Sequence, residues 1–342
     1  MIRPLRAAAR VLLPRGARLR ISHAVSDRAS RALRADLQQL ARSGDPVIVG
    51  PWLGEVGFEL LYWVPFLQWA VQDAGLDPSR LVVISRGGTQ DWYGRLAASY
   101  ADVFDLMEPA DFHSRNEARH AELGEQKQTG VTSFDREIVS RVAAQRGLTR
   151  YALLHPSRMH DLFAPYWWGH RPIEWIEQHA RFEQISVAAR GDALPAGYAA
   201  VKFYFNGCFP ATAENRAFAA RVVRQLAAEG PVVSLDTGLR VDDHAPWEEE
   251  ERLSMPGIRG GVTPSTNLGA QTRLIAGARL WAGTYGGFSY LAPFLGVPAR
   301  AFYSDAAGFS QRHLDLAART FGGFGTNLLQ VAGVRDAARA HS

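Results

Sequence analysis

The chain has 342 residues, of which 47% are hydrophobic and 21% charged, so it is long enough for two globular domains that each bury a core. No apolar run reaches the ~18–20 residues of a membrane span, and the single cysteine, Cys208, excludes an internal disulfide and a cysteine zinc site. The formal net charge is only +4 and no nucleic-acid-binding motif is present, so we expect a cytoplasmic protein that does not bind nucleic acid.

Residues 1–44 form a basic N-terminal segment. Arginines alternate there with short apolar runs such as 11–13, and the unbroken apolar core of a secretory signal is missing. One hypothesis is that this segment rests on an anionic membrane surface, at ~1 kcal/mol for each basic residue near the lipid. The alternatives are a frayed tail or a helix packed on the first domain.

The first domain is expected over residues 45–188. Short apolar strands alternate there with helices, which favours a parallel sheet covered on both faces. The expected strands are 46–50, 80–85, 103–107 and 151–157, and the expected helices are 58–74, 92–100 and 135–146. The polar stretch 111–130 has no periodicity, which predicts a loop near a cleft.

The second domain is expected over residues 198–330. A polar stretch with glycine and proline, 189–198, marks the boundary, and the alternation then restarts. The expected strands are 198–205, 232–236, 278–283 and 299–304, and the expected helices are 214–229, 268–277 and one that opens after Gly286. The predicted fold class is therefore α/β, with two Rossmann-like domains that face each other across a cleft.

A Gly-rich turn within 283–298, GTYGGFSYLAPFLGVP, follows an expected strand and opens directly into an apolar helix. Glycines let the backbone approach a ligand closely, and the free N–H groups and dipole of a helix start favour a phosphate. The residues expected to contact such a phosphate are Thr284, Gly286, Gly287, Phe288 and Ser289. An ordinary tight turn between strand and helix is the alternative.

A second Gly-rich turn lies within 47–70, VIVGPWLGEVGFELLYWVPFLQWA, also between a short apolar strand and an apolar helix. Gly54 and Glu55 lie inside it, so the Glu55 carboxylate is expected to project into a cleft at the carboxyl end of a sheet. Glu59, one helical turn later, is the reserve acid, although a scaffold role suits it as well. Arg86 follows another strand and is expected to bind the acceptor or a phosphate, unless it is simply exposed in its turn.

Three polar residues of the second half are further candidates. Lys202 lies on an apolar strand, where an unpaired charge is expensive to bury, so it is expected to reach either a cleft anion or an internal carboxylate. Asn267 and Gln271 come just before the strand 278–283, a position from which they are expected to contact a ribose or a sugar.

With these residues in view, the chain resembles glycosyltransferases of the GT-B type, and among them the lipopolysaccharide heptosyltransferases and related bacterial polysaccharide glycosyltransferases. Heptosyltransferases open with Gly-Asp-aliphatic and a later proline, and they close on Asp-Thr-Gly, His-Leu-Ala and Leu-Gly-x-Pro. The matching residues here are Gly54-Glu55-Val56 with Pro65, then Leu291-Ala292, then Leu295-Gly296-Val297-Pro298. The chain departs from that pattern with Glu55 for aspartate, Tyr285-Gly286-Gly287 for Asp-Thr-Gly, and Tyr290 for histidine.

The resemblance implies an inverting glycosyltransferase that moves a sugar from a nucleotide-sugar to a glycan or glycolipid acceptor in bacterial surface polysaccharide synthesis. It implies that Glu55 is the general base and that Lys202 and the helix start after Gly286 hold the diphosphate. No Asp-x-Asp is present, so we expect a metal-independent mechanism and no cofactor besides the nucleotide-sugar substrate.

Two other functions stay open at this point. A nucleotide-sugar epimerase of the 2-epimerase type would use a similar donor pocket without an acceptor, and a catalytically silent nucleotide-sugar-binding protein would need no base. A further hypothesis concerns an aromatic cluster, whose rings either stack on sugars or fill a core. Its members are Tyr166, Trp167, Trp168 and Trp175.

Overall fold

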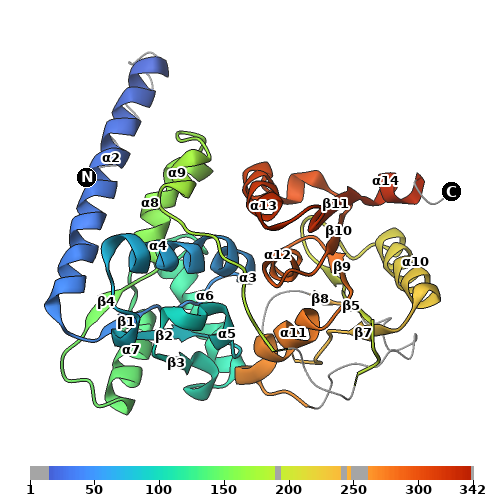
Figure 1. The fold of residues 1–342 in the computed structure, drawn as a ribbon, viewed down its shortest axis with the longest axis horizontal. Helices are drawn as coiled ribbons and strands as arrows, with labels where there is room; N and C mark the ends of the chain where they lie inside the picture. Colours follow the sequence, from blue (N-terminus) through green and yellow to red (C-terminus); the bar gives the residue numbers. More distant parts are fainter. Residues whose placement is uncertain (1–14, 189–193, 240–244, 248–260, 340–342) are drawn as a thin grey trace.

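The computed structural model describes residues 15–188, 194–239, 245–247 and 261–339. They form two α/β units that lie beside each other, each with its own sheet (Figure 1). Residues 189–193 of the expected boundary lie outside the described residues. The predicted fold class, two facing Rossmann-like units, is confirmed by this arrangement.

The first unit holds a four-stranded parallel sheet in the order β3-β2-β1-β4. Its strands are β1 (Val47–Val49), β2 (Leu81–Ser85), β3 (Ser99–Asp102) and β4 (Ala152–Leu154). In β1, one of the two central strands, Val47 pairs with Leu81 of β2 on one side and with Ala152 of β4 on the other. Both central strands are buried along their whole length, as their apolar sequences predict.

The prediction of a strand at 103–107 is wrong, and the predicted helix 92–100 is right only in its first part: helical turns over Gln90–Tyr93 and Gly94–Leu96 are followed by a strand that begins at Ser99. The third strand is β3, whose polar sequence SYAD suits a half-exposed edge position. The apolar residues after it instead form a short 3₁₀ turn, because the Asp102 carboxylate accepts the N–H of Phe104 at 2.9 Å. Here side-chain capping overrides the apolar pattern.

Helices cover both faces of this sheet. They are α2 (Arg15–Ser43), α3 (Val56–Phe58), the π-helical turn η1 (Glu59–Trp63), α4 (Val64–Ala74), α5 (Gln90–Tyr93), α6 (Pro109–Leu123), α7 (Ser133–Gln145), α8 (Ser157–Trp167) and α9 (Glu174–Glu177), with 3₁₀ turns η2 (Pro78–Arg80), η3 (Gly94–Leu96) and η4 (Val103–Asp105). Alternate strand residues pack into two separate cores: Val47 and Val49 join the one with α4, and Ile48 joins the one with α7. This alternation is why the strands read as continuous apolar runs.

The loop predicted at 111–130 is also wrong, because α6 occupies most of it. Pro109 stands at its first position, where a missing N–H is tolerated, and Gly124 ends it in the left-handed conformation (φ 71°). Only Phe112 and Arg119 of this helix are buried. A helix with only two buried residues leaves no apolar periodicity in the sequence, which hid it.

The second unit holds a five-stranded parallel sheet in the order β11-β10-β9-β5-β7. Its strands are β5 (Ala199–Lys202), β7 (Val232–Ser234), β9 (Leu280–Thr284), β10 (Ala299–Tyr303) and β11 (Leu329–Gly333), and β6 (Tyr204–Phe205) pairs separately and antiparallel with β8 (Ala245–Pro246). Its helical elements are α10 (Ala213–Glu229), η6 (Pro264–Thr266), α11 (Asn267–Ala276), α12 (Gly287–Phe294), η7 (Ala306–Gly308), α13 (Gln311–Phe324) and α14 (Val334–Arg339).

The N-terminal segment follows one of the predicted alternatives from residue 15 onward: it is a long helix, α2, packed on the first unit (Figure 1). Leu33 and Leu37 are buried, and the Arg80 guanidinium donates to the carbonyls of Leu40 and Ala41 at 2.9 and 2.8 Å. Residues 1–14, with three of the arginines of this segment, lie outside the described residues. Within the described ranges, none of the helices has both the length and the apolar character needed to cross a membrane.

Candidate functional site

A cleft of about 810 Å³ lies between the two units and is lined by residues of both. Several segments of its wall directly follow strands: 52–58 follows β1, Arg86 follows β2, 236–237 follows β7 and 285–288 follows β9. Because ligands of parallel α/β sheets bind outside the carboxyl ends of the strands, this is the expected place for a site. The cleft is therefore the candidate active site.

The first wall carries Glu55 in the turn between β1 and α3. Glu55 is exposed and lines the cleft, and its carbonyl accepts the N–H of Glu59 at 3.1 Å. Arg86 is 7% exposed and donates from Nη2 to the Gly54 carbonyl at 2.8 Å. Gly54 and Arg86 also line the cleft, so Arg86 both faces the site and fixes the turn that presents Glu55.

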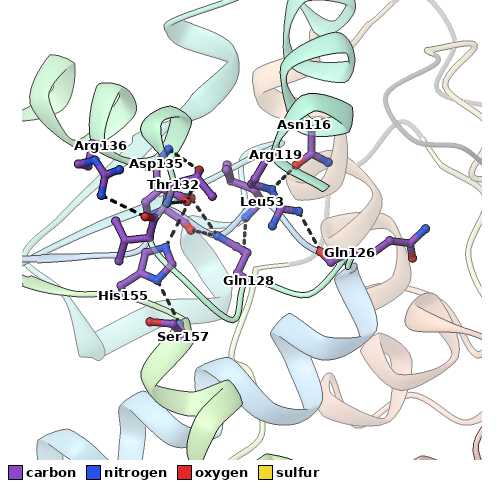
Figure 2. Close-up of polar contacts among 12 residues, drawn as sticks. Leu53, Asn116, Arg119, Gln126, Gln128, Thr132, Asp135, Arg136, His155 and Ser157 are labelled. Atoms are coloured by element: carbon purple, nitrogen blue, oxygen red, sulfur yellow. Dashed lines mark hydrogen bonds and ion pairs between the residues drawn. The ribbon is translucent and has the colours of Figure 1, made fainter. Parts of the chain in front are cut away.

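A buried polar cluster holds the same turn from behind (Figure 2). The Gln128 side chain accepts the N–H of Leu53 and donates to the carbonyl of Pro51, both at 2.9 Å, and it also donates to Asp135 at 3.3 Å. His155 lies 3.4 Å from the Asp135 carboxylate. Burial raises the pKa of Asp135, but the hydrogen bonds from His155 and Thr132 outweigh it and the net shift is downward, so this carboxylate stays charged.

Arg119 lies beside this cluster, close enough for the Asp135 charge to raise its pKa against the lowering effect of burial (Figure 2). It is 1% exposed and donates to the Asn116 side chain at 2.8 Å and to the Gln126 carbonyl at 3.0 Å. Asn116 and Gln126 both line the cleft. The cluster thus fixes the Glu55 turn, and Arg119 fixes the segment after α6, through side chains that do not themselves reach the cavity.

Glu59, the reserve acid, lies outside the cleft lining. It is 1% exposed, and one carboxylate oxygen accepts hydrogen bonds from Ser85 Oγ and Tyr93 Oη, both at 2.5 Å. Burial raises the pKa of Glu59 to about 7, against the opposing effect of those two hydrogen bonds. Its position supports the scaffold role rather than contact with a substrate.

The second wall joins the three polar candidates of the second unit into one chain of hydrogen bonds. Lys202 Nζ, at the end of β5, donates to Gln271 Oε1 at 2.6 Å, and Gln271 Nε2 donates to Asn267 Oδ1 at 2.9 Å. The Lys202 ammonium also lies 4.1 Å from the centre of the Phe288 ring. All four residues line the cleft, so the structure brings together candidates that are up to 86 positions apart.

The Gly-rich helix start divides into residues that face the cleft and residues that shape it. Gly286, Gly287 and Phe288 line the cleft. Thr284 is fully buried and donates to the Tyr204 carbonyl at 2.7 Å, and Ser289 donates to the Gly286 carbonyl at 2.6 Å. Neither Thr284 nor Ser289 is part of the cleft lining, so their side chains hold the turn while the backbone after Gly286 is what faces a ligand.

The two Gly-rich turns touch each other. A Cβ atom at Gly57 would lie 3.1 Å from the Cα of Gly287, and one at Gly287 would lie 2.6 Å from the backbone nitrogen of Gly57. Only glycine at both positions permits this approach. The Glu55 turn of the first unit and the α12 start of the second are therefore adjacent parts of one site.

Lys127 was missed by the sequence analysis. It lines the cleft, and its Nζ lies 4.5 Å from the ring centres of both Phe58 and Trp167. Burial lowers the pKa of Lys127, whereas the nearby charge of Glu55 raises it. A signal was present: Lys127 and Lys202 are the only two lysines of the chain, and both line this cleft.

Four histidines line the cleft, and none of them was among the predicted site residues: His113, His120, His160 and His313. His313 of α13 accepts or donates a 2.6 Å hydrogen bond with Tyr62 Oη of η1, which ties the two units together beside the cavity. Burial lowers the pKa of His313 to about 4 and that of His160 to about 3, so both rings are neutral near pH 7. Within the described ranges, no three His, Cys, Asp or Glu side chains gather as metal ligands.

The aromatic cluster predicted at 166–175 does not line the cleft. Tyr166 and Trp175 are buried, and the Tyr166 hydroxyl donates to the Arg312 carbonyl at 2.6 Å. Trp168 is 72% exposed. These rings fill the core or stand on the surface, as the alternative interpretation held.

Comparison with known proteins gives fold-level similarity only. No family model and no curated protein matches the chain. The structure is similar to that of E. coli ADP-heptose LPS heptosyltransferase II, with 12% identity, 84% of this chain and 90% of that chain covered, and a TM-score of 0.43. It is also similar to a glycosyl transferase family 9 protein from Veillonella parvula (13% identity, 87% and 88% covered, TM-score 0.44) and to E. coli heptosyltransferase WaaC with ADP (16% identity, 86% and 98% covered, TM-score 0.44).

Proposed function

We propose that the protein is a glycosyltransferase that moves a sugar from a nucleotide-sugar to a glycan or glycolipid acceptor. The observation that carries the proposal is the contact of the two Gly-rich turns, which sets an exposed carboxylate beside the start of α12 in one cleft. Glycosyl transfer needs both: a base for the acceptor hydroxyl and donors for the departing diphosphate.

In this mechanism the first unit binds the acceptor and the second unit binds the donor. Glu55 takes the proton of the acceptor hydroxyl, whose oxygen forms a bond to the anomeric carbon while the bond from that carbon to the diphosphate oxygen breaks. An attack on the face opposite the diphosphate inverts the anomeric configuration. The leaving diphosphate carries away the electron pair of the broken bond.

The second wall suits the leaving group. Lys202 supplies a positive charge, and the first N–H groups of α12 have no partner inside the helix. Gln271 accepts a hydrogen bond from Lys202 and so fixes the direction of its ammonium. Asn267 and Gln271 are the residues we assign to the ribose or sugar of the donor.

The test is a thermal-unfolding screen of the whole chain against nucleoside diphosphates and nucleotide-sugars, ADP-linked sugars among them. A ligand present at ~100 times its dissociation constant should add ~2.7 kcal/mol to the free energy of unfolding. Transfer from the donor that gives the largest shift is then measured on glycan and glycolipid acceptors, with the anomeric configuration of the product. No shift with any member of the screen would overturn the proposal.

Analysis of the products formed from the best donor, with and without acceptor, separates the two rival functions. An epimerase would convert the nucleotide-sugar to its C2 epimer without an acceptor, and a silent binding protein would bind it and leave it unchanged. The exposed Glu55 beside the α12 start favours transfer over silent binding.

We further propose that no metal ion takes part, that the reaction belongs to bacterial surface polysaccharide synthesis, and that it occurs on the cytoplasmic side of the membrane. Repeating the screen in chelator tests the first point: the shift should persist. A shift that disappears in chelator and returns with magnesium or manganese would contradict metal independence while leaving the transferase proposal in place.

A further inference from the structure

The long helix α2 stands at the edge of the molecule opposite α10 and packs along the outside of the first unit (Figure 1). One side of it packs inward, with Ser26, Leu33 and Leu37 buried. The other side carries two of the four large apolar side chains that are exposed in the described residues, Ile21 at 53% and Val25 at 60%.

The exposed side chains follow helical spacing. Ile21, Val25, Arg28 and Ala32 stand at i, i+4, i+7 and i+11, so they form one stripe along the helix. Arg20 and Arg31 flank this stripe on the same side and are exposed. We call the set Arg20, Ile21, Val25, Arg28, Arg31 and Ala32 the outer α2 face.

The charge of the outer α2 face is not balanced by the protein. Helix α2 contains seven arginines and only two acids, Asp27 and Asp36. Asp27 pairs with Arg171 and Asp36 lies 3.2 Å from Arg158, so the first unit already neutralises both. Among the described residues, none forms an ion pair with the three arginines of the outer face.

A third exposed apolar side chain lies at the same end of the molecule. Trp168 is in the turn after α8, two residues before His170. His170 contacts Ser22 of α2 at 3.3 Å through its ring, and its carbonyl lies 2.7 Å from the His23 ring. Exposed tryptophan is typical of proteins that touch the interface between water and lipid.

We propose that the outer α2 face binds the surface of an anionic phospholipid bilayer. Ile21 and Val25 would enter the headgroup region, and the arginines beside them would extend their apolar stems and keep their charges at the phosphates. The inference is independent of the proposed transferase activity, because it uses no residue of the cleft.

The charge pattern favours lipid over other occupants. A second copy of the chain would bring another arginine-rich helix without free acids, and like charges repel. A nucleic-acid duplex would contact the arginines through its phosphates but would offer no apolar surface to Ile21 and Val25. An anionic bilayer alone matches both the arginines and the two aliphatic residues.

The experiment measures co-sedimentation of the full chain with vesicles of equal parts phosphatidylglycerol and phosphatidylcholine, and with vesicles of phosphatidylcholine alone. Binding is expected only to the anionic vesicles, and it should weaken as salt is added. The variant R20Q/R28Q/R31Q should lose about 10²-fold in partition, since each basic residue near the surface contributes ~1 kcal/mol. I21S/V25S should lose about tenfold through its smaller buried apolar area.

The matched control is R221Q/R224Q/R300Q, which removes the same charge from exposed positions on α10 and β10 of the second unit. It should bind vesicles as the unaltered chain does. The proposal fails if the unaltered chain binds no vesicles, or binds neutral ones equally. It also fails if both outer-face variants bind normally, or if the control loses as much as R20Q/R28Q/R31Q.

Two further measurements on the lipid-free chain test whether a second copy of the chain or nucleic acid binds the outer α2 face instead. Sedimentation equilibrium that finds a dimer which I21S/V25S dissociates would assign the face to a second copy and overturn the proposal. Tighter binding to a short DNA duplex than to anionic vesicles would overturn it as well. Thermal unfolding of each variant establishes that it is folded before its binding is compared.

Discussion

Gly57 and Gly287 are 230 positions apart in the sequence, yet a Cβ atom added to Gly57 would lie only 3.1 Å from the Cα of Gly287. Each belongs to a Gly-rich turn that follows a central parallel strand. Their contact fixes the distance between the acid of the first unit and the helix start of the second. The geometry of the cleft therefore depends on glycine at both positions, because a larger side chain at either one would push the two turns apart.

Gly287→Ala should separate these turns. Its Cβ would lie 2.6 Å from the backbone nitrogen of Gly57, so backbone must shift, and overpacking of this kind destabilises by about 1–3 kcal/mol. Thermal unfolding measures this loss, and nucleotide affinity should fall with it. The control is Gly322→Ala in α13, where no atom lies within 4 Å of the new Cβ and stability should rise by roughly 0.5–1 kcal/mol. Equal stability of the two variants would contradict the contact.

Glu59 should make the protein less stable as the pH rises. Burial raises the pKa of Glu59 to about 7 from 4.5, so between these pH values the folded chain keeps a proton that the unfolded chain has lost. The free energy of unfolding should therefore fall with rising pH, by about 3 kcal/mol in total from this residue.

Glu59→Gln should remove that fall, because the amide can still accept from Ser85 and Tyr93 and carries no charge. Urea unfolding between pH 4 and pH 8, at ~1-unit steps, measures the difference between variant and unaltered chain. Above the raised pKa the variant should be the more stable of the two. Glu214→Gln, an exposed acid at the start of α10, should keep the fall. A parallel pH profile for Glu59→Gln and the unaltered chain would show that Glu59 is not the group responsible.

Much of the fold and part of the site could be predicted because buried strands are visible in the sequence as short apolar runs. β1, β2, β5 and β9 are continuous apolar runs, and a polar residue at the end of such a run lies at the sheet edge where ligands bind. Glu55, Arg86 and Lys202 were found by that reasoning, and all three line the cleft.

The rest depends on contacts that local sequence does not encode. Helix α6 buries only two residues, so its polar sequence resembles that of a loop, and β3 is an edge strand without apolar alternation. His313 reaches the cleft only because α13 packs beside η1, where Tyr62 meets it from 251 positions away. Likewise, the sequence suggested that Thr284 contacts a ligand, but its hydroxyl is hydrogen-bonded to the Tyr204 backbone and its side chain is fully buried. Tyr204 is 80 positions away, so this contact could not be predicted from the neighbours of Thr284 in the chain.

Lys202→Ala and Lys127→Ala should have different effects on binding, because the two lysines belong to opposite walls of the cleft. Loss of Lys202 should weaken binding of a nucleoside diphosphate much more than binding of the nucleoside, because its charge is assigned to the diphosphate. Lys127 lies on the Glu55 side, against Phe58 and Trp167, so its loss should leave donor affinity within about twofold and act on the acceptor step. Titrations followed by thermal unfolding measure both affinities. Equal loss of nucleoside and diphosphate binding in Lys202→Ala would make this lysine a structural residue.

Glu55 is the residue that we assign to the general base. Glu55→Gln keeps the size of the side chain and removes its charge, and Glu55 is exposed, so folding and donor affinity should survive the change. Turnover should fall by a factor of ~10²–10⁴, the usual contribution of a general base. Glu214→Gln, an exposed acid remote from the cleft, should transfer sugar at the normal rate.

If Glu55→Gln transfers normally, the base is another group. Asp236 is then the residue to test, since within the described part of the chain it is the one other acid that lines the cleft. Tight donor binding with no transfer in either the unaltered chain or the variants would instead favour a silent binding protein, because the chain would then bind the nucleotide-sugar without catalysing its reaction.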